Sequence, residues 1–203
     1  HKIAQFKEIA LNESISIGLL KASLEGAEVE LKEGSQLSLA SPGAFSLPLR
    51  LKFPECGSIL IETKSSGREE AIAALNAMVL GLLVGSPPGR LAFSLFDPVG
   101  LGESFAGLMH LADYEEILIN TRIRTQSDQI ERRLSELCDH MEKVIQMYLR
   151  NEYETISEYN EAAGTIAERY HFVVIADFPK QFSDEAGRKL PAFASREGVV
   201  VFP

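Results

Sequence analysis

The sequence has little that would indicate a disulfide-stabilised, metal-binding or membrane-spanning protein. Its 203 residues include two cysteines, Cys56 and Cys138, which give no disulfide framework and fit a reducing, cytoplasmic location. No group of cysteines and histidines has metal-ligand spacing, and no Gly-x-Ser-x-Gly nucleophile elbow is present. Glu69 and Glu70 interrupt the longest apolar region, so we expect no membrane span.

Positive charge is also scarce. Lysine and arginine number 20 against 29 aspartates and glutamates, which gives a formal net charge of −9. This balance argues against a general electrostatic footprint for nucleic acid. The hydrophobic fraction of 45% is enough for a core, in one large domain or in a core with a small appendage. The chain opens on His1 and stops at Pro203, directly after a strand-like run, and we interpret it as an excised domain.

Two kinds of pattern divide the chain, and they predict a β-rich appendage over residues 1–53 and an α/β domain over 54–203. The first part contains alternating polar and apolar runs with turn residues between them, as in half-buried antiparallel strands, at 14–17, 27–31 and 36–39. From residue 57, continuous apolar runs alternate with helical patterns, which is typical of a parallel sheet with helices on both faces. The predicted strands are 58–61, 91–96, 172–176 and 198–202, and the first helix is 68–84.

A second, longer helix is predicted from about Gln126 to Arg150. Apolar residues recur in it by threes and fours, and Thr125 to Asp128 resembles a capping box at its start. The opposite face is charged, and we interpret it as a solvated face; the alternative is a contact surface with a subunit or an upstream domain. The residues of this charged face are Glu131, Arg132, Arg133, Glu136, Asp139, Glu142 and Lys143.

The most informative stretch runs from Gly57 to Leu83. It is a strand, a turn of small residues and a long helix, which is the setting of a phosphate-binding loop. The pattern G-x-x-x-x-G-K-[ST] falls here on Glu62, Thr63, Lys64, Ser65, Ser66, Gly67, Arg68 and Glu69. The second glycine and a cation are kept, while the first glycine and the hydroxyl residue are lost.

Each departure from this pattern has a physical consequence. A phosphate-binding loop holds its anion with backbone N–H groups at a helix N-terminus, and Gly67 still permits close approach. Arg68 supplies a planar fork instead of the compact ammonium of lysine. Glu69 places a carboxylate where a hydroxyl would ligate magnesium, and Glu70 adds a second negative charge. We therefore predict that residues 62–68 bind phosphate weakly, if at all.

Three further segments carry a family resemblance. The strand 91–96 ends in Asp97-Pro98 and is followed by Met109-His110-Leu111, the long helix is followed by Tyr159-Asn160, and the strand 172–176 ends in Asp177. In this order and spacing, the segments resemble the motor domain of the FtsK/SpoIIIE family of DNA translocases, over roughly residues 57–182. The chain is also similar to the degenerate ATPase domains of the EssC/EccC secretion motors. The resemblance implies a P-loop fold, ATP and Mg²⁺ as cofactors, DNA as a ligand, and assembly into an oligomer or with other domains.

The resemblance also assigns roles and shows departures. Asp177 matches the Walker B aspartate of the family, which holds magnesium through water. Phe178 stands where the family has the glutamate that polarises the attacking water, and Val99 replaces the lysine of its Asp-Pro-Lys motif. The short distance from Asp177 to the last strand suggests a missing stretch around Leu190-Pro191.

Two polar residues, Asp97 and His110, have a structural interpretation as well as a functional one. Asp97 ends a strand where open α/β sheets bind ligands, and it could equally cap the following turn. We interpret His110 as a turn residue that packs against the sheet and has no catalytic role.

Three hypotheses for function follow. A working ATPase needs metal ligation and a water-positioning group, which positions 69 and 178 do not supply. A degenerate family member would keep the fold as a binding or assembly module. A nucleotide-binding switch unrelated to motors would need a base-recognition element, and the sequence contains none that we recognise. The sequence favours the second hypothesis.

Overall fold

The computed structural model describes residues 14–22, 45–52, 58–64, 66–113, 122–149, 153–154, 156–164, 167–194 and 199–202. The centre of the fold is a parallel sheet of β3 (Ser58–Leu60), β6 (Val199–Phe202), β5 (Tyr170–Ile175) and β4 (Leu91–Phe96), in that order. All of its neighbouring strands pair in parallel. This confirms the prediction that the apolar runs 58–61, 91–96 and 172–176 share one parallel sheet.

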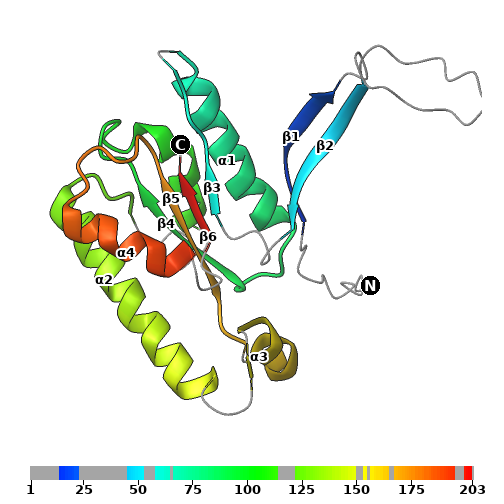
Figure 1. Ribbon diagram of the computed structural model, residues 1–203, viewed down its shortest axis with the longest axis vertical. Helices are drawn as coiled ribbons and strands as arrows, with labels where there is room; N and C mark the ends of the chain where they lie inside the picture. The colour runs from blue at the N-terminus through cyan, green and yellow to red at the C-terminus, as the bar shows by residue number, and fades with distance from the viewer. Residues whose placement is uncertain are drawn as a thin grey trace, which may run out of the picture.

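Helices cover both faces of this sheet (Figure 1), as predicted. On one face lie α1 (Arg68–Val84) and the 3-10 helix η1 (Glu103–Asp113). On the other face lie α2 (Ser127–Val144) and α4 (Asp184–Ala194). Successive strand residues point to opposite faces, so one strand supplies both cores. The α1 core receives Phe93, Leu95, Phe172 and Val174, and the α2 core receives Phe96, Val173 and Ile175.

The predicted long helix is present, as α2 with one π-helical turn after it, but it begins differently from the prediction. α2 ends at Val144 and continues as a π-helical turn, η2 (Ile145–Leu149). Ile130, Leu134 and Leu137 form its buried face, as the periodicity predicts. The capping-box prediction is wrong, because the N-cap residue is Gln126 and no side chain caps the helix. With Gln126 as the N-cap, Asp128 is the second residue of the helix, whereas a capping box needs its acidic side chain at the third. The Asp128 carboxylate lies 3.6 Å from Nη2 of Arg132 instead.

The prediction that the charged face of α2 is solvated is wrong for one residue, Arg133. The Arg133 side chain is only 11% exposed. Its Nε donates to Ser94 Oγ at 3.1 Å, and its Nη2 lies 3.1 Å from Nε2 of His171. Ser94 and His171 are the polar positions of β4 and β5 on the α2 face of the sheet, so a long cationic side chain reaches inward to satisfy them.

The N-terminal strands form a separate antiparallel hairpin of β1 (Ser14–Ala22) and β2 (Phe45–Lys52). It stands beside α1, apart from the parallel sheet (Figure 1), and β1 contacts α1. The predicted strand at 14–17 is therefore confirmed and is longer than expected. The predicted strands at 27–31 and 36–39 lie outside the described residues, and the division into domains at residue 53 stays a prediction.

The remaining elements complete the second half of the chain. α3 (Ile156–Ala163) precedes β5, and the buried Asn160 donates to Glu168 O at 3.0 Å and accepts from Glu168 N–H at 2.7 Å. The Tyr159-Asn160 segment, which contributes to the family resemblance, thus holds the backbone of Glu168 in place just before β5. Leu190 and Pro191, where we expected a missing stretch, lie within α4. Among the described residues, no helix combines the length and apolar character needed to span a bilayer.

Candidate nucleotide site

The candidate site lies where the N-terminus of α1 meets the C-terminal ends of β4 and β5. Gly67 is the N-cap residue of α1 and has a φ of 100°, a backbone conformation that glycine adopts without a steric penalty. Glu62, Thr63, Lys64 and Ser66 of the preceding loop are exposed, and Ser65 lies outside the described residues. Glu69 and Glu70 are exposed in the first turn of α1. The predicted loop therefore does lead into a helix N-terminus.

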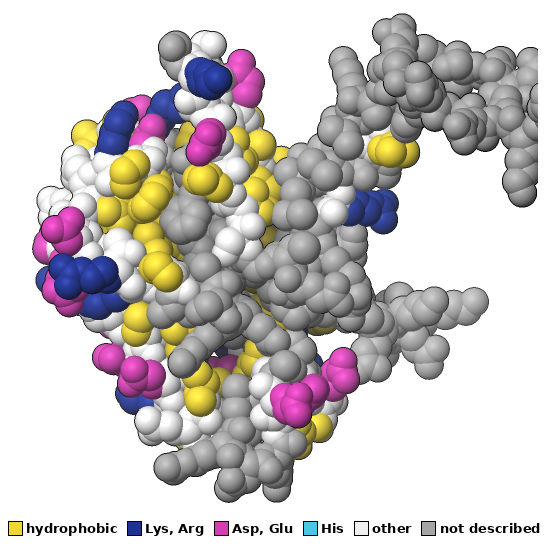
Figure 2. Space-filling view, in the orientation of Figure 1, with side chains coloured by type: hydrophobic (Ala, Val, Ile, Leu, Met, Phe, Trp, Pro, Cys, Tyr) yellow, Lys and Arg dark blue, Asp and Glu magenta, His cyan; other side chains and the backbone are white. Residues whose placement is uncertain are grey.

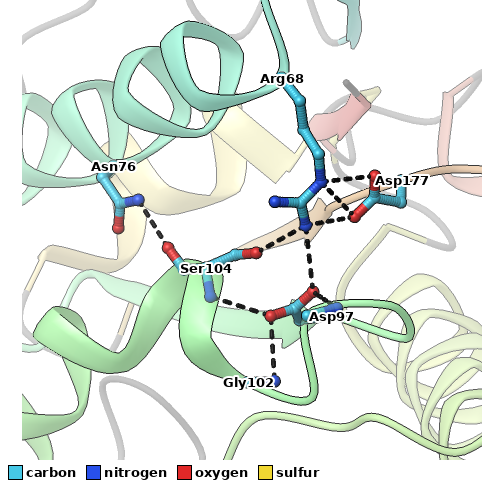
Figure 3. Close-up of polar contacts among 7 residues, drawn as sticks. Arg68, Asn76, Asp97, Gly102, Ser104 and Asp177 are labelled. Carbon is cyan, nitrogen blue, oxygen red and sulfur yellow. Dashed lines mark hydrogen bonds and ion pairs between the residues drawn. The ribbon is translucent and has the colours of Figure 1, made fainter.

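Arg68 of this loop is paired with Asp177, which lies two residues after the end of β5 (Figure 3). Nε of Arg68 donates to Asp177 Oδ1 at 2.8 Å and to Oδ2 at 3.1 Å, and Nη2 donates to Oδ2 at 2.6 Å. This two-pronged geometry is the strongest form of the arginine–carboxylate pair. The structure thus joins two residues that the sequence assigned separately, one to the loop and one to the Walker B strand.

The pair changes the protonation equilibria of both groups. The hydrogen bonds from Arg68 lower the pKa of Asp177, which its partial burial alone would raise. The same hydrogen bonds raise the pKa of Arg68. The folded-state pKa of Asp177 is lower than the ordinary pKa of an aspartate. The pair therefore contributes its full stability above the ordinary pKa, and this contribution is lost as the pH falls from there through the folded-state pKa.

Asp97 occupies a different environment, fully buried at the end of β4. Its Oδ1 accepts the backbone N–H of Gly100 at 2.9 Å, and its Oδ2 accepts those of Gly102 and Ser104 at 3.0 Å each. The carboxylate thereby fixes the turn between β4 and η1. Of the two roles considered for Asp97, the turn-capping role is the one that these contacts describe, and a ligand role stays a prediction.

Gly100 is required for this arrangement. A Cβ atom at position 100 would lie 2.6 Å and 2.8 Å from the carboxylate oxygens of Asp97, and 2.8 Å from Ser104 Oγ. We expect Gly100→Ala to lower the free energy of unfolding by about 1–3 kcal/mol, since a buried charged group must shift to make room. Chemical denaturation measures this. Gly107→Ala is the matched control, because a Cβ there meets nothing within 4 Å; equal effects of the two substitutions would contradict the prediction.

Ser104 and Asn76 belong to the site but were missed by the sequence analysis. Ser104 Oγ accepts a hydrogen bond from Arg68 Nη2 at 3.2 Å, and Ser104 O accepts one from Asn76 Nδ2 at 2.9 Å. Figure 3 shows these residues connecting α1 to the turn after β4. Asn76 could have been noticed as an isolated polar residue in the apolar run of α1. Ser104 gives no signal in the sequence, since only the fold of the turn places it there.

Phe178 and the histidines take no part in this site. The Phe178 ring packs against that of Phe182, with centroids 5.3 Å apart, at the edge of the α2 core. His110 is 85% exposed and lies 3.8 Å from Asp113, so the prediction that it packs against the sheet is wrong. Its helix η1 buries Phe105 and Leu108 instead. His171 has a pKa lowered to about 4, first by burial and then by Arg133, and it is neutral at physiological pH.

The residues at this site do not match the ligand set of a magnesium–nucleotide complex. Arg68 is already hydrogen-bonded to Asp177, and the exposed side chain of Glu69 offers a carboxylate and no hydroxyl. Of the residues that the structure describes, no cluster of three or more histidine, cysteine or acidic side chains could hold a metal ion.

The fold and the position of the site define the class of the protein. A parallel sheet with helices on both faces, and a loop entering a helix beside the ends of two strands, is the architecture of P-loop ATPases, and solved structures of that class are similar to it. The sequence pattern of the FtsK/SpoIIIE family matches residues 63–198, and the chain belongs to this family.

Three solved structures illustrate the similarity. The conjugation coupling protein TcpA of pCW3, solved as a monomer with ATPγS, has a TM-score of 0.53 at 22% identity over 76% of this chain. EssC (ATPases 2 and 3) from Geobacillus thermodenitrificans has a TM-score of 0.60 at 17% identity over 95%. EccC (ATPases 2 and 3) from Thermomonospora curvata, in complex with a signal sequence peptide, has a TM-score of 0.62 at 17% identity over 98%.

The match covers only part of each of these proteins. It spans 44% of the TcpA chain and 33% of each of the EssC and EccC chains. At these identities the similarity shows a shared fold. No curated protein sequence matches the chain significantly.

Proposed function

We propose that this FtsK/SpoIIIE-family domain is a degenerate one, which binds ATP weakly or not at all and serves as a binding or assembly module. The observation that carries the proposal is the pair between Arg68 and Asp177. In this arrangement, the cation available to a phosphate and the carboxylate available to a metal neutralise each other. A nucleotide would have to break two or more charge-assisted hydrogen bonds before either residue could bind it.

The charges around the pair support the same proposal. Glu69 and Glu70 occupy the first turn of α1, and the exposed Glu62 belongs to the loop before it. Helix N-termini favour anions, but an incoming triphosphate would also meet these carboxylates. Lys64 offsets them only partly. The local field is therefore less favourable to a triphosphate than that of a loop with glycine at position 62 and threonine at position 69.

The partner of the module is either DNA or a protein, which includes other domains of the same protein. On the face shown in Figure 2, acidic and basic side chains are interspersed, and the chain as a whole has a net charge of −9. A DNA-binding face is expected to gather basic side chains. These charges favour a protein partner over DNA.

The alternative is an active ATP-driven motor domain for DNA or for a secreted protein. Membership of the family favours it, since this family contains ATP-driven translocases, and TcpA was solved with ATPγS. This alternative requires Arg68 to leave Asp177 when nucleotide arrives.

Isothermal titration calorimetry distinguishes the two. We expect the wild-type protein to show no micromolar ATP binding, with or without Mg²⁺, because the loop cation is paired and position 69 has no hydroxyl. Micromolar, Mg²⁺-dependent binding would contradict the proposal and support the motor alternative.

A gain-of-function variant tests the register of the loop. Arg68→Lys with Glu69→Thr restores the Gly-Lys-Thr ending of the pattern, removes the two-pronged pair and supplies a metal-ligating hydroxyl. We expect ATP affinity in the presence of Mg²⁺ to rise by about tenfold or more, because one charge repulsion is removed and a ligand is gained. The matched control is Arg68→Lys with Glu70→Thr, which makes the same change of charge one residue further along. An equal gain in both variants, or none in either, would show that position 69 is not the metal-ligand position.

A further inference from the structure

Arg124 is a buried arginine without a carboxylate partner. The residue is only 7% exposed, and it lies three positions before the start of α2. In the described part of the chain, its side chain makes one hydrogen bond, from Nη1 to the backbone oxygen of Arg122 at a long 3.5 Å, and no ion pair. Buried charges are normally paired with an opposite charge, because withdrawing an unpaired charge from water is costly. Arg124 is therefore a buried charge that calls for an explanation.

The backbone of Arg124 extends the parallel sheet at its β4 edge. Its N–H donates to Leu95 O at 3.0 Å, and its carbonyl accepts the N–H of Asp97 at 2.9 Å, so it pairs in parallel with Phe96. Residues that are paired in this way have their side chains on the same face of a sheet. Because Phe96 belongs to the α2 core, the side chain of Arg124 lies on the α2 face. Its place there is set by backbone hydrogen bonds and not by its charge.

The surroundings of Arg124 carry an excess of positive charge. Arg133 reaches the same face of the sheet, where its Nε donates to Ser94 Oγ, and its Nη1 lies 3.0 Å from the carboxylate of Glu136. Burial, and then the charge of Arg133, lower the pKa of Arg124 to about 10; Glu136 opposes this effect and Arg122 adds to it. The guanidinium is still cationic at neutral pH. Three arginines and one carboxylate leave two positive charges in excess.

Arg122 places a second cation at the surface beside the buried one. Its side chain is exposed and makes no hydrogen bond or ion pair within the described residues. Arginine forks bind phosphate oxygens with paired N–H donors. A phosphate group carries between one and two negative charges near neutral pH, which matches the excess charge around Arg124 better than the single charge of a carboxylate does.

We propose that Arg122 and Arg124 form a binding site for a phosphate group beside β4 and the start of α2, and that Arg133 adds to its positive charge. The ligand is free phosphate or the phosphomonoester of a small molecule. This site is distinct from the candidate nucleotide site, because Arg124 lies on the α2 face of the sheet and Arg68 lies at the start of α1, on the other face. The inference goes beyond the proposed function and does not depend on it.

The test uses the whole chain without nucleotide. The midpoint of thermal unfolding is measured in sodium phosphate, in glycerol phosphate and in sodium chloride at equal ionic strength, and phosphorus NMR gives the dissociation constants. We expect phosphate at about ten times its dissociation constant to raise the midpoint by about 3–5 °C over chloride. Tighter binding of glycerol phosphate would identify a phosphomonoester as the ligand, and binding of phosphate alone would identify the free ion. A wild-type midpoint that is the same in all three salts would overturn the inference.

Arg124→Met removes the buried charge and keeps a long, flexible side chain. We expect it to abolish the shift of the midpoint by phosphate. We also expect it to raise the midpoint in chloride, because it replaces an unpaired buried charge with an apolar group. If this variant does not fold, by circular dichroism, Arg122→Met tests the same site at an exposed position, and it should weaken phosphate binding by about fivefold or more.

Two further variants locate the bound phosphate. Arg132→Met removes an arginine that is 67% exposed on α2, and it should keep the full phosphate shift. Arg68→Met should also keep it, since Arg68 belongs to the other face of the sheet. A phosphate shift that is lost in Arg68→Met but retained in the Arg124 and Arg122 variants would place the ion at the N-terminus of α1 and overturn the inference. Failure of the proposed function is measured separately, as Mg²⁺-dependent ATP binding by the wild type.

Discussion

Purified protein is expected to release no phosphate from ATP above background, with or without DNA. Phosphoryl transfer depends almost entirely on positioning and on electrostatic stabilisation of the transferring group. In the proposed alignment with the family, Glu69 replaces a metal-ligating hydroxyl, and Phe178, which packs against Phe182, replaces the water-polarising glutamate. A single well-placed polar group is commonly worth about a hundredfold or more in rate, so the loss of two leaves little catalysis. Asp177 cannot replace them while Arg68 holds its carboxylate.

The measurement is phosphate release over hours at high protein concentration, with Asp177→Ala as the control. The wild type and the variant should be indistinguishable. Turnover that disappears in Asp177→Ala would show that the site is active, and that a carboxylate elsewhere or from a neighbouring subunit polarises the water.

The second large effect is expected from Asp97→Asn. The carboxylate of Asp97 is fully buried and accepts three backbone N–H groups on its two oxygens. An amide offers one oxygen, so its NH₂ group must face at least one N–H donor with no acceptor between them. The neighbouring guanidinium of Arg68 also loses a carboxylate 4.0 Å away. Breaking a buried, charge-assisted network of this kind costs about 2–4 kcal/mol.

Urea denaturation gives the free energy of unfolding for this comparison. Asp113→Asn is the matched control, because Asp113 is 77% exposed and is the last residue of η1, the helix that follows the turn. It should change the stability by less than about 0.5 kcal/mol. If Asp97→Asn had an equally small effect, the turn would not depend on its carboxylate.

The periodicity of the sequence was sufficient for the central fold. The apolar runs at 91–96 and 172–176 are too continuous for a strand with one solvated face, so they predict a sheet covered on both sides, and helices lie on both sides. The bounds of α1 follow from Gly67 and Gly85, which flank it. Helix start signals were less reliable. The Thr125–Asp128 pattern has the composition of a capping box, but the backbone enters α2 one residue later, at Gln126.

Long side chains were harder to assign than short ones. Arg133 lies on the polar face of α2, and helical periodicity predicts that its side chain is exposed to solvent. Its length allows it to reach back to Ser94 and His171 on the sheet. No pattern within α2 contains this information, because the two polar partners belong to strands 38 or 39 positions away in sequence.

By itself, the sequence determined which residue types stand at the loop and at the strand ends: Gly67, Arg68 and Glu69 in the loop, and Asp97 and Asp177 after their strands. It also determined the family, since the order of these motifs matches FtsK/SpoIIIE proteins. Only the tertiary structure decided how these residues are paired. Arg68 and Asp177 are 109 positions apart, and they meet because the parallel order of the sheet brings the end of β5 next to the start of α1. Local patterns follow from helix and strand geometry within a few residues, whereas a contact across the sheet depends on strand order, which no local pattern contains.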